Sequence, residues 1–252
     1  MAPRDLGACE VYPQQVKHNS NGSFICVCGD GEYIIYTSQA LRNKAYGSAL
    51  EFVWSSQATG DYAIRESSSR VRLFKNFKEH KQIALPMSSA DGIFGGACLA
   101  VQGPDCICFF DWDEGEFIRK IDVAPTDIYW NDTADACVLV CDDSYFVLKY
   151  DMEIVKGALD TDSASAEEGV DGSFELDYTI NDVVKTGQWV GDCFLYTNDK
   201  GKLHYFVGGE VMTLCHPNSQ CYILGYVPKE DRVFLIDKAY NVTSYVLVLL
   251  IY

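Results

Sequence analysis

Gly29-Asp30-Gly31 is the first stretch of this sequence that could do chemistry, because glycine-rich loops can cradle anionic ligands. A phosphate loop is followed by a helix whose N-terminus faces the anion. Here the flanking runs are FICVC and EYIIY, both dense in β-branched and aromatic residues. Asp-Gly between two such runs is the strongest short-range signal of a β-hairpin. The stretch therefore predicts a turn between two strands and not a ligand loop.

Two pairs of cysteines have the spacing that places both thiols on one face of a strand. They are Cys26 with Cys28, and Cys106 with Cys108. Such thiols could bind a soft metal, but structural zinc sites prefer two to four residues between paired cysteines. Apolar residues lie between and beside both pairs, and free cysteine packs as a small hydrophobe. We expect buried thiols and no metal site.

The histidines give no sign of catalysis, since they are scattered along the chain as His18, His80, His204 and His216. Cys215 precedes His216, but neighbouring residues on a strand point to opposite faces and chelate poorly. The sequence has neither a G-x-S-x-G motif nor a Walker loop. It predicts no catalytic, metal or cofactor-binding residue, and we do not expect an enzyme.

The charge balance is strongly acidic, with 36 acidic against 20 basic residues and a net charge of −16. Such a chain repels phosphate backbones and anionic lipids, which counts against nucleic-acid binding and against membrane binding by the domain alone. The segment Arg65–Lys81 is the exception, with six basic and two acidic residues. It is interpreted as a solvated strand edge, with a local basic patch as the alternative.

The chain contains eleven cysteines, an odd number with irregular spacing, which is not a disulfide framework. Its first residues, MAPRDLGACE, include no apolar segment of a secretory signal. We expect reduced thiols in the cytosol. The apolar run Val246–Ile251 is far shorter than the roughly 20 residues of a membrane helix.

A repeat of about 40 residues organises the chain. Six segments resemble the outer hairpin of a four-stranded unit, and they start 38, 36, 39, 57 and 30 residues apart, at Glu32, Arg70, Cys106, Tyr145, Lys202 and Arg232. Ala49–Ser56 and Pro125–Asp132 are interpreted as inner strands, each with a tryptophan before a polar turn. The pattern predicts an all-β, WD40-like β-propeller with about six recognisable four-stranded blades.

The longest spacing has a visible cause, the segment from Ala158 to Tyr178, which has seven acidic residues and no basic one. It is interpreted as an inter-blade insertion, solvated and mobile, with room for a short helix. The alternative is a partner contact, because propeller function usually lies on loops.

Several long stretches resemble the second β-propeller of the β′ subunit of coatomer, the coat of Golgi-derived vesicles. They are VYPQQVKHNSNGSFICVCGDGEYIIYTSQALRNKAYGSALEFVWSS, YAIRESSSRVRLFKNFKE, GQWVGDCFLYTN, YFVGGEV and YILGYVPKEDRVFLIDKAYNVTSY. The resemblance runs from about Leu6 to Tyr252 and is loosest from Asp160 to Asp177.

The resemblance implies a structural and interaction module of the COPI outer coat, acting in Golgi-to-ER and intra-Golgi transport. It implies the α and ε coatomer subunits as partners through the parent chain, and indirect membrane association through the Arf GTPase. The location would be cytoplasmic, peripheral on Golgi membranes and COPI-coated vesicles. The dilysine pocket of the family lies in the first propeller, so no dilysine-binding residue is carried over.

The family's second propeller is usually drawn with seven blades. We therefore expect residues 1–252 to form a single propeller domain whose ring is incomplete or irregularly closed, with the strand around Val242–Leu250 supplying closure. The alternative function is a propeller that binds peptides or ubiquitin on one face, including cargo tails, without catalysis. That alternative is an analogy from fold.

Overall fold

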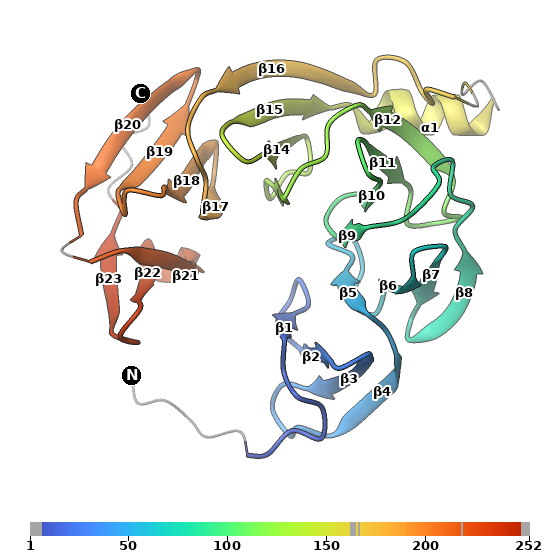
Figure 1. The fold of residues 1–252 in the computed structure, drawn as a ribbon, viewed down its shortest axis with the longest axis horizontal. Coiled ribbons are helices and arrows are strands. Elements are labelled where there is room, and N and C mark those ends of the chain that lie inside the picture. Colours follow the sequence, from blue (N-terminus) through green and yellow to red (C-terminus); the bar gives the residue numbers. More distant parts are fainter. Residues whose placement is uncertain (1–6, 162–164, 166, 218, 248–252) are drawn as a thin grey trace. The chain divides into compact units, whose positions relative to one another are not determined.

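The computed structural model describes residues 7–161, 165, 167–217 and 219–247, and it groups their strands into six antiparallel sheets (Figure 1). Five of these sheets have four strands and the sixth has three. The chain divides into two compact units, one from residues 1–124 with 151–173 and the other from 125–150 with 174–252. The prediction of an all-β propeller built from about six blades is confirmed.

The first unit contains three sheets and the α-helix α1 (Met152–Asp160). Its strands, in chain order, are β1 (Gln15–His18), β2 (Phe24–Gly29), β3 (Glu32–Thr37), β4 (Asn43–Ser48), β5 (Glu51–Trp54), β6 (Tyr62–Ser67), β7 (Arg70–Lys75), β8 (Lys78–Gln82), β9 (Gly92–Phe94), β10 (Leu99–Gln102), β11 (Ile107–Phe110) and β12 (Phe117–Ile121). Each successive group of four forms one blade.

The second unit contains the other three sheets and a short 3₁₀ helix, η1 (Pro228–Glu230). Its strands are β13 (Asp127–Trp130), β14 (Ala136–Val140), β15 (Tyr145–Tyr150), β16 (Phe174–Ile180), β17 (Thr186–Val190), β18 (Cys193–Thr197), β19 (Leu203–Val207), β20 (Glu210–Cys215), β21 (Cys221–Val227), β22 (Arg232–Asp237) and β23 (Val242–Val246). None of the described residues forms a helix with the length and apolar character needed to span a bilayer.

The Asp30-Gly31 turn joins β2 to β3, in which Gly29 pairs with Glu32. Both central residues have positive φ, 51° at Asp30 and 80° at Gly31. A two-residue turn of this kind matches the right-handed twist of the strands that it connects. The predicted hairpin is confirmed.

Within each unit, neighbouring blades are held together by apolar side chains from the strands of two sheets. One such cluster, which includes Phe52, Tyr62 and Ile35, lies between the first and second blades, and another, which includes Phe194 and Tyr145, lies between the fourth and fifth. A sheet can be stable only when it buries an apolar face against another element.

Tryptophan N–H groups join the first strands of neighbouring blades. Trp54 Nε1 on β5 donates to the carbonyl of Lys17 on β1 at 3.1 Å. Trp189 Nε1 on β17 donates to the carbonyl of Tyr129 on β13 at 2.9 Å. The predicted inner strand around Trp54 is therefore a point of attachment between blades, and β17 repeats the arrangement in the second unit.

The last blade differs from the sequence prediction by one strand. The hairpin starting at Arg232 is formed by the second and third strands of its sheet, because β21 takes the first position beside β17. Ile223 N on β21 donates to Thr186 Oγ1 on β17 at 2.8 Å. The third strand thus starts at Val242, 39 residues after Leu203, so the regular spacing is kept. The second and third strands of a blade form a hairpin, and so do the third and fourth. The two hairpins have the same sequence pattern, which explains the shift by one strand.

The fourth segment is also corrected, because only Tyr145–Tyr150 of it is a strand. Asp151 ends that strand by capping α1, and its Oδ1 accepts hydrogen bonds from the backbone N–H groups of Glu153 and Ile154. The outer strand of this blade is β16, which returns after the helix and pairs with β15. The predicted insertion at 158–178 therefore overlaps both α1 and β16.

The expected closing strand lies partly outside the described residues, which end at Leu247. Within them, β23 pairs with β22 of its own sheet. The single domain and the incomplete ring stay predictions.

Replacing Gly31 by alanine tests the turn. We expect a loss of about 1 kcal/mol in unfolding free energy, because φ is positive while nothing lies within 4 Å of the added Cβ. Gly157, inside α1, is the matched control, since its Cβ also meets nothing within 4 Å. Gly157→Ala should stabilise by about 0.5–1 kcal/mol. Urea denaturation of both variants measures the difference, and equal effects would contradict the turn assignment.

Candidate functional site

The two charged segments singled out in the sequence are the candidate interaction surfaces, and each includes residues of the outer strand of a blade. The basic segment, Arg65–Lys81, forms the end of β6, the strand β7 and most of β8. The acidic segment, residues 158–178, runs from the end of α1 into β16. The basic segment belongs to the first compact unit, and the acidic segment belongs to the same unit as far as residue 173.

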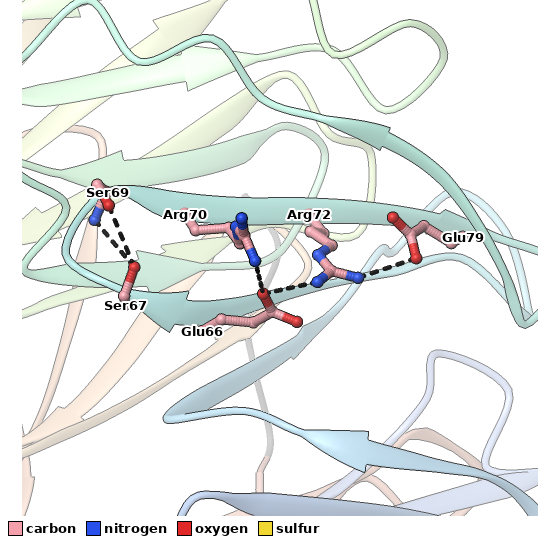
Figure 2. A network of polar contacts seen from close by, with 6 residues as sticks. All are labelled: Glu66, Ser67, Ser69, Arg70, Arg72 and Glu79. Carbon is pink, nitrogen blue, oxygen red and sulfur yellow. Dashed lines mark hydrogen bonds and ion pairs between the residues drawn. The ribbon is translucent and has the colours of Figure 1, made fainter.

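The arginines of the basic segment are paired within their own blade (Figure 2). Glu66 Oε2 lies 2.9 Å from Arg72 Nη2 and 3.5 Å from Arg70 Nη1. Arg72 Nη1 also contacts Glu79 Oε2 at 2.9 Å. In the turn before β7, the Ser69 N–H donates to Ser67 Oγ. The positive charge of this stretch is therefore largely neutralised locally.

Acidic residues of the β11–β12 turn lie beside two further residues of the hairpin, Lys75 and His80. Lys75 Nζ lies 2.8 Å from Asp113 Oδ1, and this hydrogen bond raises the pKa of Lys75 above its usual value. His80 Nε2 lies 3.7 Å from Glu114 Oε1. Among the described residues Lys78 and Lys81 have no ion pair and are exposed. The interpretation of this segment as a solvated strand edge agrees with these contacts.

The acidic insertion covers the outer edge of the third blade. We call Ser165 and residues 167–171 the strap. The carbonyl of Glu168 accepts a hydrogen bond from Lys120 N at 3.1 Å, and Val170 N donates to the carbonyl of Ile118 at 2.6 Å. This described part of the insertion is thus paired to β12 like an extra strand, in contrast to the solvated, mobile loop that the sequence predicts.

Arg119 on β12 adds side-chain contacts to the strap. Its Nη1 donates to the carbonyl of Val170 at 3.5 Å and lies 3.6 Å from Asp171 Oδ1. Asp171 is fully exposed, so this ion pair contributes little to stability. The backbone pairing carries the attachment.

Gly169 lies where strap and strand come closest. A Cβ at this position would stand 2.1 Å from the carbonyl oxygen of Ile118, and its φ is +90°. Only glycine fits such an approach without displacing backbone. The backbone pairing of the strap with β12 therefore requires glycine at position 169.

A hollow of about 560 Å³ opens beside the strap. Its walls come from the end of β8, the β11–β12 turn and the C-terminal part of α1, and include Lys81, Leu85, Glu116, Phe117, Leu159 and Ser165. Lys81 and Glu116 are the charged side chains among its lining residues. The hollow thus combines an apolar floor with opposite charges.

The paired cysteines lie in the packing between blades. Cys26 and Cys28 belong to the cluster of the first two blades, and Cys106 and Cys108 to that of the second and third. Burial raises the pKa of Cys26, and it raises that of Cys108 to about 12. Such thiols stay protonated at neutral pH and are poor nucleophiles and ligands. The prediction of buried, apolar thiols is confirmed, and all eleven cysteines are free.

Each of the four histidines lies on or beside a different strand. His18 lies on β1, His80 on β8, His204 on β19, and His216 follows β20. Among the described residues no three histidine, cysteine or carboxylate side chains form a group that could hold a metal.

His204 is part of a buried polar network that the sequence did not reveal. Asn198 Nδ2 donates to His204 Nε2 at 3.2 Å, while His204 Nδ1 lies 3.2 Å from Thr213 Oγ1 on β20. Asn198 Oδ1 accepts the N–H groups of Lys200 and Lys202, which fixes the orientation of the amide. Nε2 must therefore be unprotonated, and Nδ1–H is the donor to Thr213.

Asp182 completes this network from the loop before β17. Its Oδ2 accepts from Tyr196 OH at 2.9 Å, and its Oδ1 lies 3.5 Å from Asn198 Nδ2. Burial lowers the pKa of His204 below its usual value. The network joins the inner loop of the blade to its outermost strand.

The family described as COPA/B second beta-propeller matches residues 1–237. The chain belongs to this family. It is 51% identical over 250 residues to "Coatomer subunit beta'-2" of Oryza sativa subsp. japonica, covering 99% of this chain and 27% of that protein. It is 47% identical over 245 residues to "Coatomer subunit beta'" of Homo sapiens, covering 97% and 27%.

Two solved structures have a similar fold at low sequence identity. The Neurospora crassa Pan2 WD40 domain has a TM-score of 0.66 and 9% identity, covering 94% of this chain and 76% of that one. A chain in the crystal structure of the Mitotic Checkpoint Complex has a TM-score of 0.64 and 11% identity, covering 92% and 75%. These likenesses support the fold alone, and the chain spans about a quarter of the length of its curated relatives.

Gly169→Ala should detach the strap from β12. We expect the amides of Lys120 and Val170 to exchange hydrogen about tenfold faster or more, because the backbone contact must open. Gly172→Ala is the matched control, since Gly172 also has positive φ but its Cβ would meet only Ile154 Cδ1, at 3.5 Å. Hydrogen–deuterium exchange measures both. Unchanged exchange in Gly169→Ala would contradict the dependence on glycine.

The His204 network should make stability depend on pH. Because the folded pKa of His204 lies below the unfolded value near 6.5, the unfolded chain binds the proton more readily. The contribution of His204 to the unfolding free energy is present above pH 6.5 and is lost as the pH falls through the pKa of the folded state.

Chemical denaturation across this range measures the effect. His204→Gln should weaken the fall in stability with acidification, whereas His18→Gln, at an exposed position on β1, should leave it as in the wild type. Identical pH profiles for wild type and His204→Gln would show that His204 does not carry the effect.

Proposed function

We propose that this chain is a structural and interaction module of a coatomer-type outer coat, acting in COPI vesicle transport. The observation that carries the proposal is the family match over residues 1–237, together with relatives named as coatomer β′ subunits. This chain spans 27% of the length of those relatives. The proposed role is therefore one that it shares with the rest of a longer β′-type subunit.

The geometry supports a scaffold rather than a catalyst. Cys26 and Cys108 are buried and protonated, and His204 is used in structural hydrogen bonds. The packed sheets provide rigid blades whose outer strands can meet neighbours. We assign no catalytic residue and no cofactor.

We also propose that both compact units belong to one propeller domain, which the family match supports because it spans residues of both. The partners are the α and ε coatomer subunits, reached through the parent chain, and the membrane is reached indirectly through the Arf GTPase. The location is cytoplasmic, on Golgi membranes and COPI vesicles. A net charge of −16 favours protein partners over nucleic acid.

Reconstitution tests the proposal. Deleting the segment that matches residues 7–247 from a full-length β′ subunit should reduce coat assembly on liposomes loaded with Arf–GTP. The control is binding of a dilysine peptide to the same deleted subunit, which should persist because the family places that pocket in the first propeller. Normal coat assembly by the deleted subunit would overturn the proposal.

A titration separates this function from peptide or ubiquitin binding. Adding a dilysine peptide or ubiquitin to the isolated chain should cause no saturable shift of its NMR signals. A saturable shift would favour the peptide-binding function instead.

A further inference from the structure

Four hydroxyl residues of this chain precede a carboxylate by three positions. They are Ser48, Ser88, Ser165 and Thr179, and the carboxylates are Glu51, Asp91, Glu168 and Asp182. Acid-directed kinases select a hydroxyl with carboxylates at this spacing on its C-terminal side, because basic groups of the kinase bind them. Such a kinase needs a hydroxyl that it can reach and a carboxylate that is free to be bound.

Two of the four hydroxyls lie in strands, and their carboxylates already have partners. Ser48 is the last residue of β4, and Glu51 accepts a hydrogen bond from Arg65 Nε at 2.9 Å. Thr179 lies within β16, and Asp182 accepts a hydrogen bond from a tyrosine hydroxyl at 2.9 Å. Neither position offers a free acidic group beside an accessible backbone.

The other two hydroxyls differ in the carboxylates that follow them. Ser88 lies in the loop between β8 and β9, where Asp91 accepts a hydrogen bond from the next serine at 3.0 Å. Ser165 is followed by two carboxylates, Glu167 and Glu168. All three of these residues are exposed, and neither glutamate has an ion pair within the described ranges. Ser165 is therefore the hydroxyl that meets both conditions.

Backbone donors surround the Ser165 hydroxyl. Its Oγ accepts the N–H groups of Glu167 and Glu168, at 3.3 and 3.4 Å. Successive N–H groups that converge in this way form a concavity that binds anions. Ser165 and Gly169 also exchange two backbone hydrogen bonds of 2.9 Å, which fix the turn at the start of the strap. A phosphate on Oγ would thus meet donors that are already in place.

Lys81 adds a cation to the same hollow. It lines the hollow from the end of β8, and Ser165 lines it from the strap. The Lys81 side chain is exposed and has no ion pair in the part of the chain that the structure describes. A serine phosphate carries about −1.5 to −2 charges at neutral pH and has three acceptor oxygens. It can therefore bind Lys81 and the backbone donors together.

We propose that Ser165 is a phosphorylation site of an acid-directed serine kinase, and that its phosphate pairs with Lys81 and holds the strap on β12. The hydroxyl oxygen attacks the γ-phosphorus of a nucleoside triphosphate bound by the kinase. The new O–P bond forms as the bond to the β–γ bridging oxygen breaks, so the nucleoside diphosphate leaves. The hydroxyl proton passes to a carboxylate of the kinase. This inference does not depend on the proposed coat function.

The phosphate would change how firmly the edge of β12 is covered. In the unmodified chain, backbone pairing at Lys120 and Val170 attaches the strap. Charge-assisted bonds at Ser165 would make local opening of the strap rarer. Since an open strand edge is a template for pairing with another chain, the modification would close β12 to added strands.

Treatment of this chain with casein kinase II and ATP, followed by mass spectrometry of its peptides, tests the site. We expect the phosphate on Ser165, and Glu168→Gln should slow its incorporation about tenfold, because a bound carboxylate is lost. Ser165→Ala should abolish it, whereas the matched control Ser88→Ala should leave it unchanged. Incorporation at Ser88 in place of Ser165, or no incorporation, would overturn the proposal.

Hydrogen–deuterium exchange of the phosphorylated chain tests the pairing. The amides of Lys120 and Val170 should exchange about threefold slower or more than in the unmodified chain, because the strap opens less often. Lys81→Met should accept the phosphate but lose this slowing. Lys78→Met, on the same strand but outside the hollow, should keep it. Faster exchange after phosphorylation, or slowing that persists in Lys81→Met, would contradict the pairing.

Discussion

Burial of sheet faces against neighbouring sheets is the constraint on which the rest of this structure depends. A four-stranded antiparallel sheet cannot hide both faces by itself, so each blade is stable only through its neighbours within the unit. The side chains in these contacts are large, such as Phe52, Tyr62 and Phe194, and full burial of one contributes about 1.5–3 kcal/mol. The indole hydrogen bonds of Trp54 and Trp189 add direction to this packing, since each ties one first strand to the next.

The same constraint explains where chemistry is absent. Residues that alternate into the inter-blade cores must be apolar or neutral, and the thiols of Cys26 and Cys108 satisfy this by remaining protonated. His204 satisfies it by remaining neutral between Asn198 and Thr213. What stays available to partners is the rim, where the outer strands meet solvent. There β4, β8 and β16 carry charged side chains, and the strap covers the edge of β12.

Much of the fold was readable because it rests on local patterns. The Asp30-Gly31 turn has its own backbone chemistry, and the alternation around Cys26 and Cys28 follows directly from strand geometry. The family could likewise be recognised from long stretches of residues. In the sixth blade the predicted strand positions were shifted by one strand. Hairpins formed by successive strands look alike in sequence until the inner strand is located. The sequence left room for a short helix in the insertion at 158–178, but α1 already begins at Met152, because Asp151 ends β15 and caps the helix directly.

The sequence alone determined the fold class, the repeat, the turn at Gly29-Asp30-Gly31, the buried thiols and the family, because each depends on residues close together or on a long continuous match. Only the tertiary structure decided what the charged segments do. The basic hairpin meets acids more than thirty residues away, as Lys75 meets Asp113, and the strap reaches back about fifty residues to β12.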